Sequence, residues 1–163
     1  MTTRLNIVAL APDAVKGLMA VEASIAGSGI EHGLLELVRL RASQINGCAY
    51  CIHMHVTDAL KNGETDMRMH LLAAWRDSSV FTDRERAALN WTETLTHVSR
   101  AGAPNIDYAV LQSQFNAVEI ANLTVLIGTI NLWNRLQIGL HAVAPLDAPT
   151  AIAADAIELG YIR

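Results

Sequence analysis

The only two cysteines of this chain stand in one short segment, QINGCAYCIHMH, at residues 44–55. Cys48, Cys51 and His55 follow one another at helical spacing, so a helix that begins near Cys48 would carry all three side chains on one face. The unpaired N–H groups and the positive dipole at a helix start favour a thiolate, which makes Cys48 the more acidic cysteine on this argument. A second thiol one turn away can convert a sulfenic acid into a disulfide. The segment therefore suits two-electron redox chemistry.

His55 can accept a thiol proton or stabilise the thiolate as an imidazolium, and it would do so better with an acid to orient it. Glu36 is a candidate for that acid, because helices on either side of residues 46–47 should be antiparallel and bring Glu36 and His55 to similar heights. Glu36 also stands among apolar residues, where a carboxylate without a task is expensive. The alternative is a surface ion pair of Glu36 with Arg39 or Arg41, and both interpretations stay open at this point.

Cys48, Cys51 and His55 could instead supply three zinc ligands. No fourth ligand lies at the usual spacing, so we expect no metal and no other cofactor. The remaining histidines receive no role: two are expected on solvated helix surfaces and three have no companion group nearby in sequence, namely His53 and His70, and His32, His97 and His141.

The fold class predicted from the sequence is all-α. Apolar residues recur at helical spacing almost throughout, and no window alternates apolar and polar residues over the length of a strand. Asn62 and Gly63 mark a helix end, and Thr82 with Glu85 forms a capping box. The expected helices cover residues 13–26, 31–45, 48–62, 64–75, 82–100, 107–114 and 117–142, and a tail from about 145 contains a short helix over 151–159.

The composition indicates a single domain that does not act alone. The 163 residues suffice for one core, but 52% of them are apolar and only 17% are charged, so we expect a homo-oligomer to bury the excess. A net charge of −4 provides no basic field for phosphates, so we expect neither nucleic acid nor an anionic membrane as a partner. The first residues are too weakly apolar for a secretory signal, so the cytoplasm is the expected location.

The motif Glu36, eleven residues, Cys48, two residues, Cys51, three residues, His55, with INGCAYC inside it, closely resembles the alkylhydroperoxidase AhpD-like branch of the carboxymuconolactone decarboxylase superfamily. The segments ERAALNWTETLT and LIGTINLWNRL are similar to stretches of that branch, so the resemblance spans roughly residues 5–142. It implies an all-α fold that assembles as a homotrimer or homohexamer, and a peroxidase activity that uses both cysteines. By position it implies that Cys51 is the peroxidatic thiol, Cys48 the resolving thiol, and Glu36 with His55 a proton relay.

Two features depart from a simple transfer of these roles. The helix-start argument makes Cys48 the more acidic thiol, but we follow the resemblance, because the first cysteine of such a turn can be buried while the second faces a pocket. Tyr50 stands where the best-described members have a histidine. A phenol with a pKa near about 10 can donate a hydrogen bond but is a poor base at neutral pH, so Tyr50 is at most an auxiliary residue.

The longest apolar stretch, residues 118–140, contains too many polar side chains for a membrane span and is expected to be a buried or interfacial helix. Its polar Asn131, Asn134 and Arg135 would need partners, and we expect these to be hydrogen bonds between helices within the trimer rather than a catalytic role. Three tryptophans are expected to be core or interface anchors rather than substrate platforms: Trp75, Trp91 and Trp133.

The leading hypothesis is a thiol peroxidase that reduces hydrogen peroxide or organic hydroperoxides. Its electrons would return from a dithiol donor, which the relatives suggest is a lipoylated or a thioredoxin-like protein. One alternative is a carboxymuconolactone decarboxylase-type lyase, although members that resemble that lyase lack the cysteine pair. The other is a non-catalytic redox-sensing oligomer, in which the disulfide only changes stability.

Overall fold

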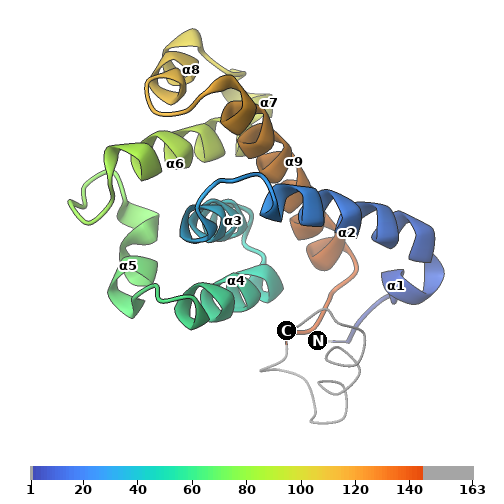
Figure 1. Ribbon diagram of the computed structural model, residues 1–163. Helices are drawn as coiled ribbons and strands as arrows, with labels where there is room; N and C mark the ends of the chain where they lie inside the picture. The colour runs from blue at the N-terminus through green and yellow to red at the C-terminus, as the bar shows by residue number, and fades with distance from the viewer. Residues whose placement is uncertain (1, 145–163) are drawn as a thin grey trace.

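The computed structural model describes residues 2–144, and every regular element within them is helical (Figure 1). The elements are α1 (Ile7–Leu10), α2 (Pro12–Ala26), α3 (His32–Asn46), α4 (Ala49–Lys61), α5 (Asp66–Leu71), the 3-10 turn η1 (Leu72–Ala74), α6 (Asp83–Thr96), α7 (Val98–Ala101), α8 (Asn105–Gln112) and α9 (Ala117–Gly139). The all-α prediction is therefore confirmed for this part of the chain. The helix expected over 151–159 lies outside the described residues.

Local capping explains where several helices begin. The capping box of Thr82 and Glu85 is present at α6, and a second one, which the sequence reading missed, joins Asn116 and Glu119 at α9. The single helix expected over 82–100 was wrong, because the backbone leaves the helical region at His97 and α6 and α7 are separate. β-branched residues stand on both sides of His97, and such residues favour a helix only weakly.

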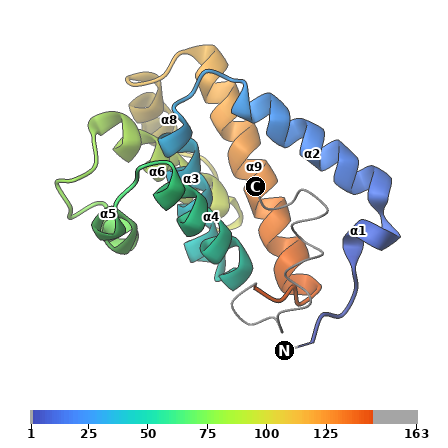
Figure 2. The ribbon, with the colours of Figure 1, turned by 60° about the horizontal axis from the view of Figure 1, so that its bottom comes forward.

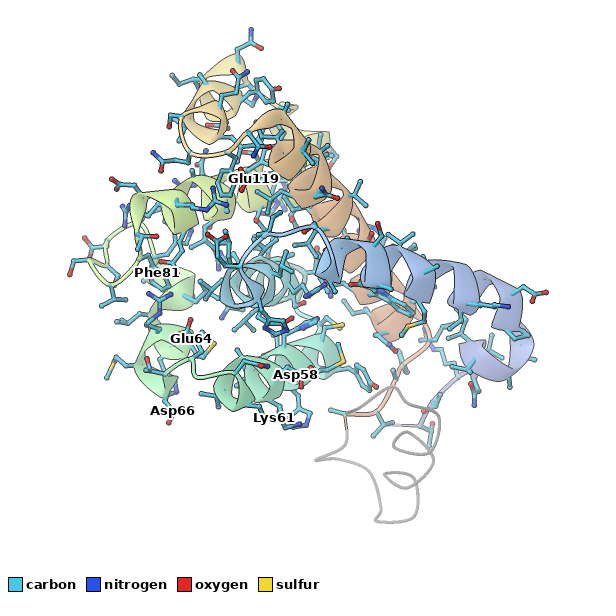
Figure 3. The ribbon with its side chains drawn as sticks, in the orientation of Figure 1. Asp58, Lys61, Glu64, Asp66, Phe81 and Glu119 are labelled. Atoms are coloured by element: carbon cyan, nitrogen blue, oxygen red, sulfur yellow. The ribbon has the colours of Figure 1, made fainter. Side chains whose placement is uncertain are left out.

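Helix α3 is the centre of the molecule, and it packs against α4, α6 and α9 (Figures 1 and 2). All side chains from Leu34 to Leu40 are buried, which requires neighbours on every side of the helix. Figure 3 shows α4, with its labelled Asp58 and Lys61, beside α3. Two apolar clusters share this helix: one includes its Leu34 and Val38 with α6 and α9, and the other its Leu37 and Leu40 with α4, η1 and α6.

A tight turn joins α3 to α4 and places the two cysteines. Gly47 has a φ of 70°, in the left-handed region that favours glycine. The Cys48 N–H donates a hydrogen bond to the carbonyl oxygen of Ser43, with an N to O distance of 3.0 Å. Cys48 is the N-cap residue of α4, and its Sγ accepts a hydrogen bond from the Cys51 N–H at 3.4 Å. Cys48 therefore stands at the start of α4, where the sequence predicted a helix to begin.

Helix α9 crosses the molecule between α2 on one side and α3 and α4 on the other (Figure 2). It has 23 residues, and its buried side chains include the polar Asn131 and Asn134. Among residues 2–144 no helix combines the length and the apolar character that a membrane span requires.

Candidate redox site

A cavity of about 240 Å³ lies between α2, α3, α4 and α9. Cys51 and His55, one turn apart on α4, both line it, whereas Cys48 is not among the lining residues. The lining side chains are Met19, Glu22, Glu36, Arg39, Tyr50, Cys51, Met54, His55, Asp58, Trp133 and Gln137. The cavity is smaller than the pockets of roughly 300–1,000 Å³ that hold drug-sized ligands. Its size suits a small substrate that reaches Cys51.

The two cysteines form a buried pair, with the Sγ atoms 2.8 Å apart. A hydrogen bond from the Cys51 thiol lowers the pKa of Cys48 to about 7, and backbone N–H groups at the start of α4 contribute although burial opposes them. The same hydrogen bond, together with burial, raises the pKa of Cys51. This is the order that the position of Cys48 at the helix start predicts.

Because the thiols share a hydrogen bond, they titrate as a pair rather than as separate groups. The first proton leaves near pH 7, and the resulting negative charge is held between the two sulfurs. The second proton is much harder to remove, since it would place two negative charges side by side in a buried site. Near neutral pH the pair is therefore available as a monoanion, with one sulfur lining the cavity and the other behind it.

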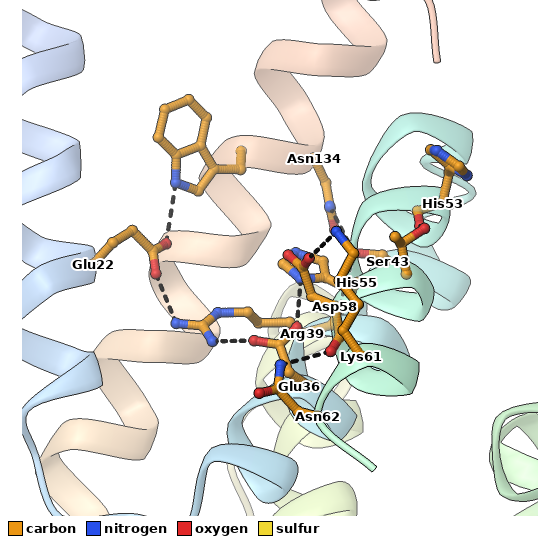
Figure 4. Close-up of polar contacts among 12 residues, drawn as sticks. Glu22, Glu36, Arg39, Ser43, His53, His55, Asp58, Lys61, Asn62 and Asn134 are labelled. Atoms are coloured by element: carbon orange, nitrogen blue, oxygen red, sulfur yellow. Dashed lines mark hydrogen bonds and ion pairs between the residues drawn. The ribbon is translucent and has the colours of Figure 1, made fainter. Parts of the chain in front are cut away.

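A chain of hydrogen-bonded charged groups runs from His55 on α4 through α3 to Glu22 on α2 (Figure 4). The Nδ1–H of His55 donates to Glu36 Oε2 at 2.8 Å, and Arg39 Nη1 donates to Glu36 Oε1 at 2.6 Å. The other end of the same guanidinium donates to Glu22 Oε2 at 2.8 Å. Glu22 also accepts from the Trp133 indole at 3.1 Å. Each oxygen of both carboxylates is thus occupied.

The electrostatics keep Glu36 ionised although it is only 5% exposed. Burial by itself would raise the pKa of this carboxyl, but the hydrogen bond and charge of His55 and those of Arg39 outweigh burial and lower it. A carboxylate can only accept, so Nδ1 of His55 carries a hydrogen, and whenever the ring is neutral Nε2 is the nitrogen without one. Nε2 is buried and has no hydrogen-bond partner among the described residues. It is therefore free to accept a proton beside the cavity.

The two interpretations of Glu36 prove to be compatible in part. Glu36 contacts both His55 and Arg39, but the pair with Arg39 is buried, so the prediction of a surface ion pair was wrong in its location. Arg41 instead pairs with Glu93 at 2.7 Å. The leucine-rich segment of α3 can bury both Glu36 and Arg39, because the guanidinium donates a hydrogen bond to the carboxylate and the two charges are opposite.

The hydrogen bonds between helices that were expected for the asparagines of α9 are present and lie within this chain: Asn46 donates to Asn131 at 2.9 Å and to Asn134 at 2.8 Å. Trp133 lines the cavity, a position that the sequence did not predict. Tyr50 also lines the cavity.

Sequence reasoning gave no site role to three residues on helices distant in sequence from the motif: Glu22, Trp133 and Asn134. The sequence signal that could have pointed to this helix was its polarity, because Asn131 and Asn134 stand inside the otherwise apolar α9. Within residues 2–144, no three His, Cys, Asp or Glu side chains are grouped so as to hold a metal ion.

Comparisons with known proteins identify the family of this chain. The model of the carboxymuconolactone decarboxylase family matches residues 12–94. One similar solved structure is ATU0492 from Agrobacterium tumefaciens, a protein of unknown function described as a candidate antioxidant defence protein AhpD. It is 40% identical to this chain and superposes with a TM-score of 0.86, and the match covers 88% of this chain and 99% of ATU0492. The uncharacterized protein YdfG of Bacillus subtilis is 34% identical over 140 residues, which are 86% of this chain and 95% of YdfG. The fold is shared with an uncharacterized peroxidase-related protein from Ralstonia eutropha JMP134, described as an alkylhydroperoxidase AhpD core. The TM-score is 0.74 at 18% identity, and the match covers 84% of this chain and 73% of that protein.

Proposed function

Because this chain belongs to the AhpD-like branch of the carboxymuconolactone decarboxylase family, we propose that it is a thiol-dependent peroxidase that reduces hydrogen peroxide or organic hydroperoxides. The observation that carries the proposal is the contact of Cys48 with Cys51 beside a cavity that His55 also lines. A buried dithiol that shares a cavity with an imidazole nitrogen that has no hydrogen-bond partner among the described residues is suited to repeated two-electron oxidation and reduction.

In the first step Cys51 attacks the hydroperoxide, because it is the sulfur that reaches the cavity. His55 Nε2 takes the thiol proton, and the Cys51 thiolate forms an S–O bond with the terminal peroxide oxygen while the O–O bond breaks. Cys51 becomes a sulfenic acid, and the alkoxide that leaves takes the proton back from His55 and departs as an alcohol, or as water when the substrate is hydrogen peroxide. The sulfur is oxidised by two electrons and the peroxide is reduced by two.

In the second step Cys48 resolves the sulfenic acid. Its sulfur attacks the sulfur of Cys51, a disulfide forms, and the hydroxide that leaves combines with the Cys48 proton to give water. The 2.8 Å separation of the two sulfurs means that this bond can form with little movement of α4. A dithiol donor then reduces the disulfide by exchange and is itself oxidised, which restores both thiols.

Glu36 holds the proton acceptor in its working form. Its carboxylate fixes the Nδ1–H tautomer of His55 and stabilises the imidazolium that forms when Nε2 takes the thiol proton. Arg39 in turn holds Glu36 and Glu22 in place. Tyr50 lines the same cavity and can serve as an auxiliary hydrogen-bond donor to the peroxide.

The proposal includes an assembly and a partner. Helix α9 exposes Val118, Val125 and Leu132 at seven-residue spacing, which is a helix face suited to contact with a second copy in a homotrimer or homohexamer. A lipoylated or thioredoxin-like dithiol protein in the cytoplasm would return the electrons. No nucleic acid or membrane partner is part of this proposal.

A steady-state assay tests the function. Reduced protein is supplied with tert-butyl hydroperoxide and an excess of dihydrolipoamide or reduced thioredoxin, and hydroperoxide loss is measured for the wild type and for Cys51→Ser and Cys48→Ser. We expect many equivalents of hydroperoxide consumed per wild-type subunit and no dithiol-dependent turnover in either variant. Consumption that stops at about one equivalent with every donor would indicate a redox sensor instead. Loss of carboxymuconolactone absorbance without peroxide turnover would indicate the lyase.

A further inference from the structure

Arg39 is shared between two carboxylates that come from different helices. Its Nη1 donates to Glu36 Oε1 on α3 at 2.6 Å, and its Nη2 donates to Glu22 Oε2 on α2 at 2.8 Å (Figure 4). The arginine therefore binds only one of the two oxygens of Glu36. The other oxygen, Oε2, is left for Nδ1 of His55, which lies 2.8 Å away.

An arginine and a carboxylate that pair by themselves adopt a different arrangement. The guanidinium is a planar fork, and it commonly binds both oxygens of one carboxylate through two parallel N–H···O bonds. Glu36 and Arg39 stand three positions apart on one helix, where side chains are neighbours. A two-bond pair of these residues would occupy Oε2 of Glu36 and compete with His55 for it.

Glu22 is held in a position to prevent that pairing. Its Oε1 accepts the Trp133 indole N–H at 3.1 Å, which leaves Oε2 for the arginine. The side chains of Glu22 and Arg39 are 21% and 10% exposed, so water competes little for this ion pair. Glu22 thus acts on His55 through Arg39 and Glu36.

We propose that Glu22 is a positioning residue for the proton acceptor, because it holds Nη2 of Arg39 and so keeps Oε2 of Glu36 available to His55. Without Glu22, Nη2 would be a buried charged donor that has lost its partner, which is unfavourable. The guanidinium would then close on both oxygens of Glu36, the carboxylate that it already contacts. The proposal rests on the proposed function only in treating His55 as the proton acceptor.

The consequence is a change in the tautomer of His55, which needs no peroxide to observe. When Nδ1 loses its carboxylate acceptor, the neutral ring is no longer confined to the form that carries its hydrogen on Nδ1. A ring with its hydrogen on Nε2 cannot accept the thiol proton. Because a positioned base contributes about 10²- to 10⁴-fold in rate, loss of Glu22 should lower kcat/KM by about tenfold or more.

The test compares Glu22→Leu with Glu64→Leu. Glu64 is a matched control, because it also shares one arginine with a second carboxylate: Arg68 Nε donates to Glu64 at 2.8 Å, and Arg68 Nη2 donates to Glu85 at 2.5 Å. Glu64 does not line the cavity. Both variants and the wild type are labelled with ¹⁵N in their histidine rings, and the His55 resonances are assigned by their absence from His55→Gln.

Spectra are recorded at alkaline pH, where the ring is neutral and its two nitrogens give separate resonances. We expect the wild type and Glu64→Leu to carry the hydrogen of His55 on Nδ1, and Glu22→Leu to show the form with the hydrogen on Nε2. A folded Glu22→Leu protein with the wild-type tautomer would overturn the proposal. Glutamine is a neutral and weaker acceptor for a cation, so Glu22→Gln should change in the same direction to a smaller extent. Glu22→Gln decides the matter if the leucine variant does not fold.

A double variant separates this role from a structural one. In Glu22→Leu combined with Arg39→Met no guanidinium remains to occupy Glu36, so Oε2 is again free and the hydrogen of His55 should return to Nδ1. If Glu22 only joined α2 to α3, removal of Arg39 as well would not restore the tautomer, and a double variant that keeps the hydrogen on Nε2 would contradict the proposal. The tautomer can be measured even if no hydroperoxide is turned over, so its failure is distinct from failure of the proposed function.

Discussion

Replacement of Glu36 by glutamine tests the proton relay at the residue that joins His55 to Arg39. Each oxygen of the Glu36 carboxylate accepts one strong hydrogen bond, from His55 at 2.8 Å and from Arg39 at 2.6 Å. Glutamine offers one oxygen and one N–H₂ group. Because Arg39 is a cation that can only donate, the glutamine oxygen should turn to it and the N–H₂ group should face His55. His55 Nδ1 must then become an acceptor, and its proton moves to Nε2.

This exchange of tautomers removes the base from the cavity without removing the histidine. A protonated Nε2 cannot accept the thiol proton, and a positioned general base contributes about 10²- to 10⁴-fold in rate. We therefore expect kcat/KM of Glu36→Gln for tert-butyl hydroperoxide to fall by at least about 10²-fold. The loss of stability should be limited to about 1–3 kcal/mol, because Arg39 keeps its bond to Glu22 at 2.8 Å.

Glu93→Gln provides the control. Glu93 is also a partly buried carboxylate with a lowered pKa, and it accepts hydrogen bonds from Trp75, Arg76 and Arg41. It does not line the cavity. The stability of both variants is measured by urea denaturation, and their activity by hydroperoxide consumption with excess dithiol. Equal activity of Glu36→Gln and Glu93→Gln, both near the wild type, would refute the relay. Because His55 and Glu36 serve one proton, Glu36→Gln combined with His55→Gln should be little slower than the slower single variant.

Three further predictions follow from the same structure. Mild peroxide treatment should give an intramolecular Cys48–Cys51 disulfide, seen by mass spectrometry as a loss of two hydrogens, and detection of only sulfinic or sulfonic acid would contradict a resolving cysteine. Substitution of arginine for Val125 or Leu132 should dissociate the oligomer in light scattering, whereas a wild-type monomer at micromolar concentration would rule out the interface. Because the pKa of Glu36 is lowered, its stabilising effect is complete above its ordinary value of 4.5 and is lost as the pH falls through the lower folded value. Glu36→Gln should therefore flatten the decline of the urea midpoint below pH 4.5, and an unchanged decline would contradict the ion pair.

The parts of the fold and the site that local sequence determines were predictable. Helical periodicity identified the main helices, and the glycine after α3 marked the turn that precedes Cys48. The spacing of Cys48, Cys51 and His55 placed them on one helix, and antiparallel packing brought Glu36 to His55. The family that this motif indicated is confirmed by the match over residues 12–94.

The remaining features depend on contacts between segments far apart in the chain. Glu22 meets Arg39 only because α2 and α3 both border the cavity, and no local pattern specifies that arrangement. Asn134 is separated from Ser43 by 91 positions, so its polarity was visible in the sequence but its partner was not. The break at His97 was also missed, because the apolar periodicity continues across a backbone change at a single residue.

Rapid-quench mass spectrometry of the reduced protein, mixed with one equivalent of tert-butyl hydroperoxide, tests the dithiol cycle most directly. The peptide that contains both cysteines should first gain one oxygen on Cys51 and then lose water to become the Cys48–Cys51 disulfide, while one equivalent of tert-butanol appears with the first event. In Cys48→Ser the oxygen adduct should persist or oxidise further. If the hydroperoxide is left intact, or if the first oxygen appears on Cys48, the proposed sequence of attack by Cys51 and resolution by Cys48 is contradicted.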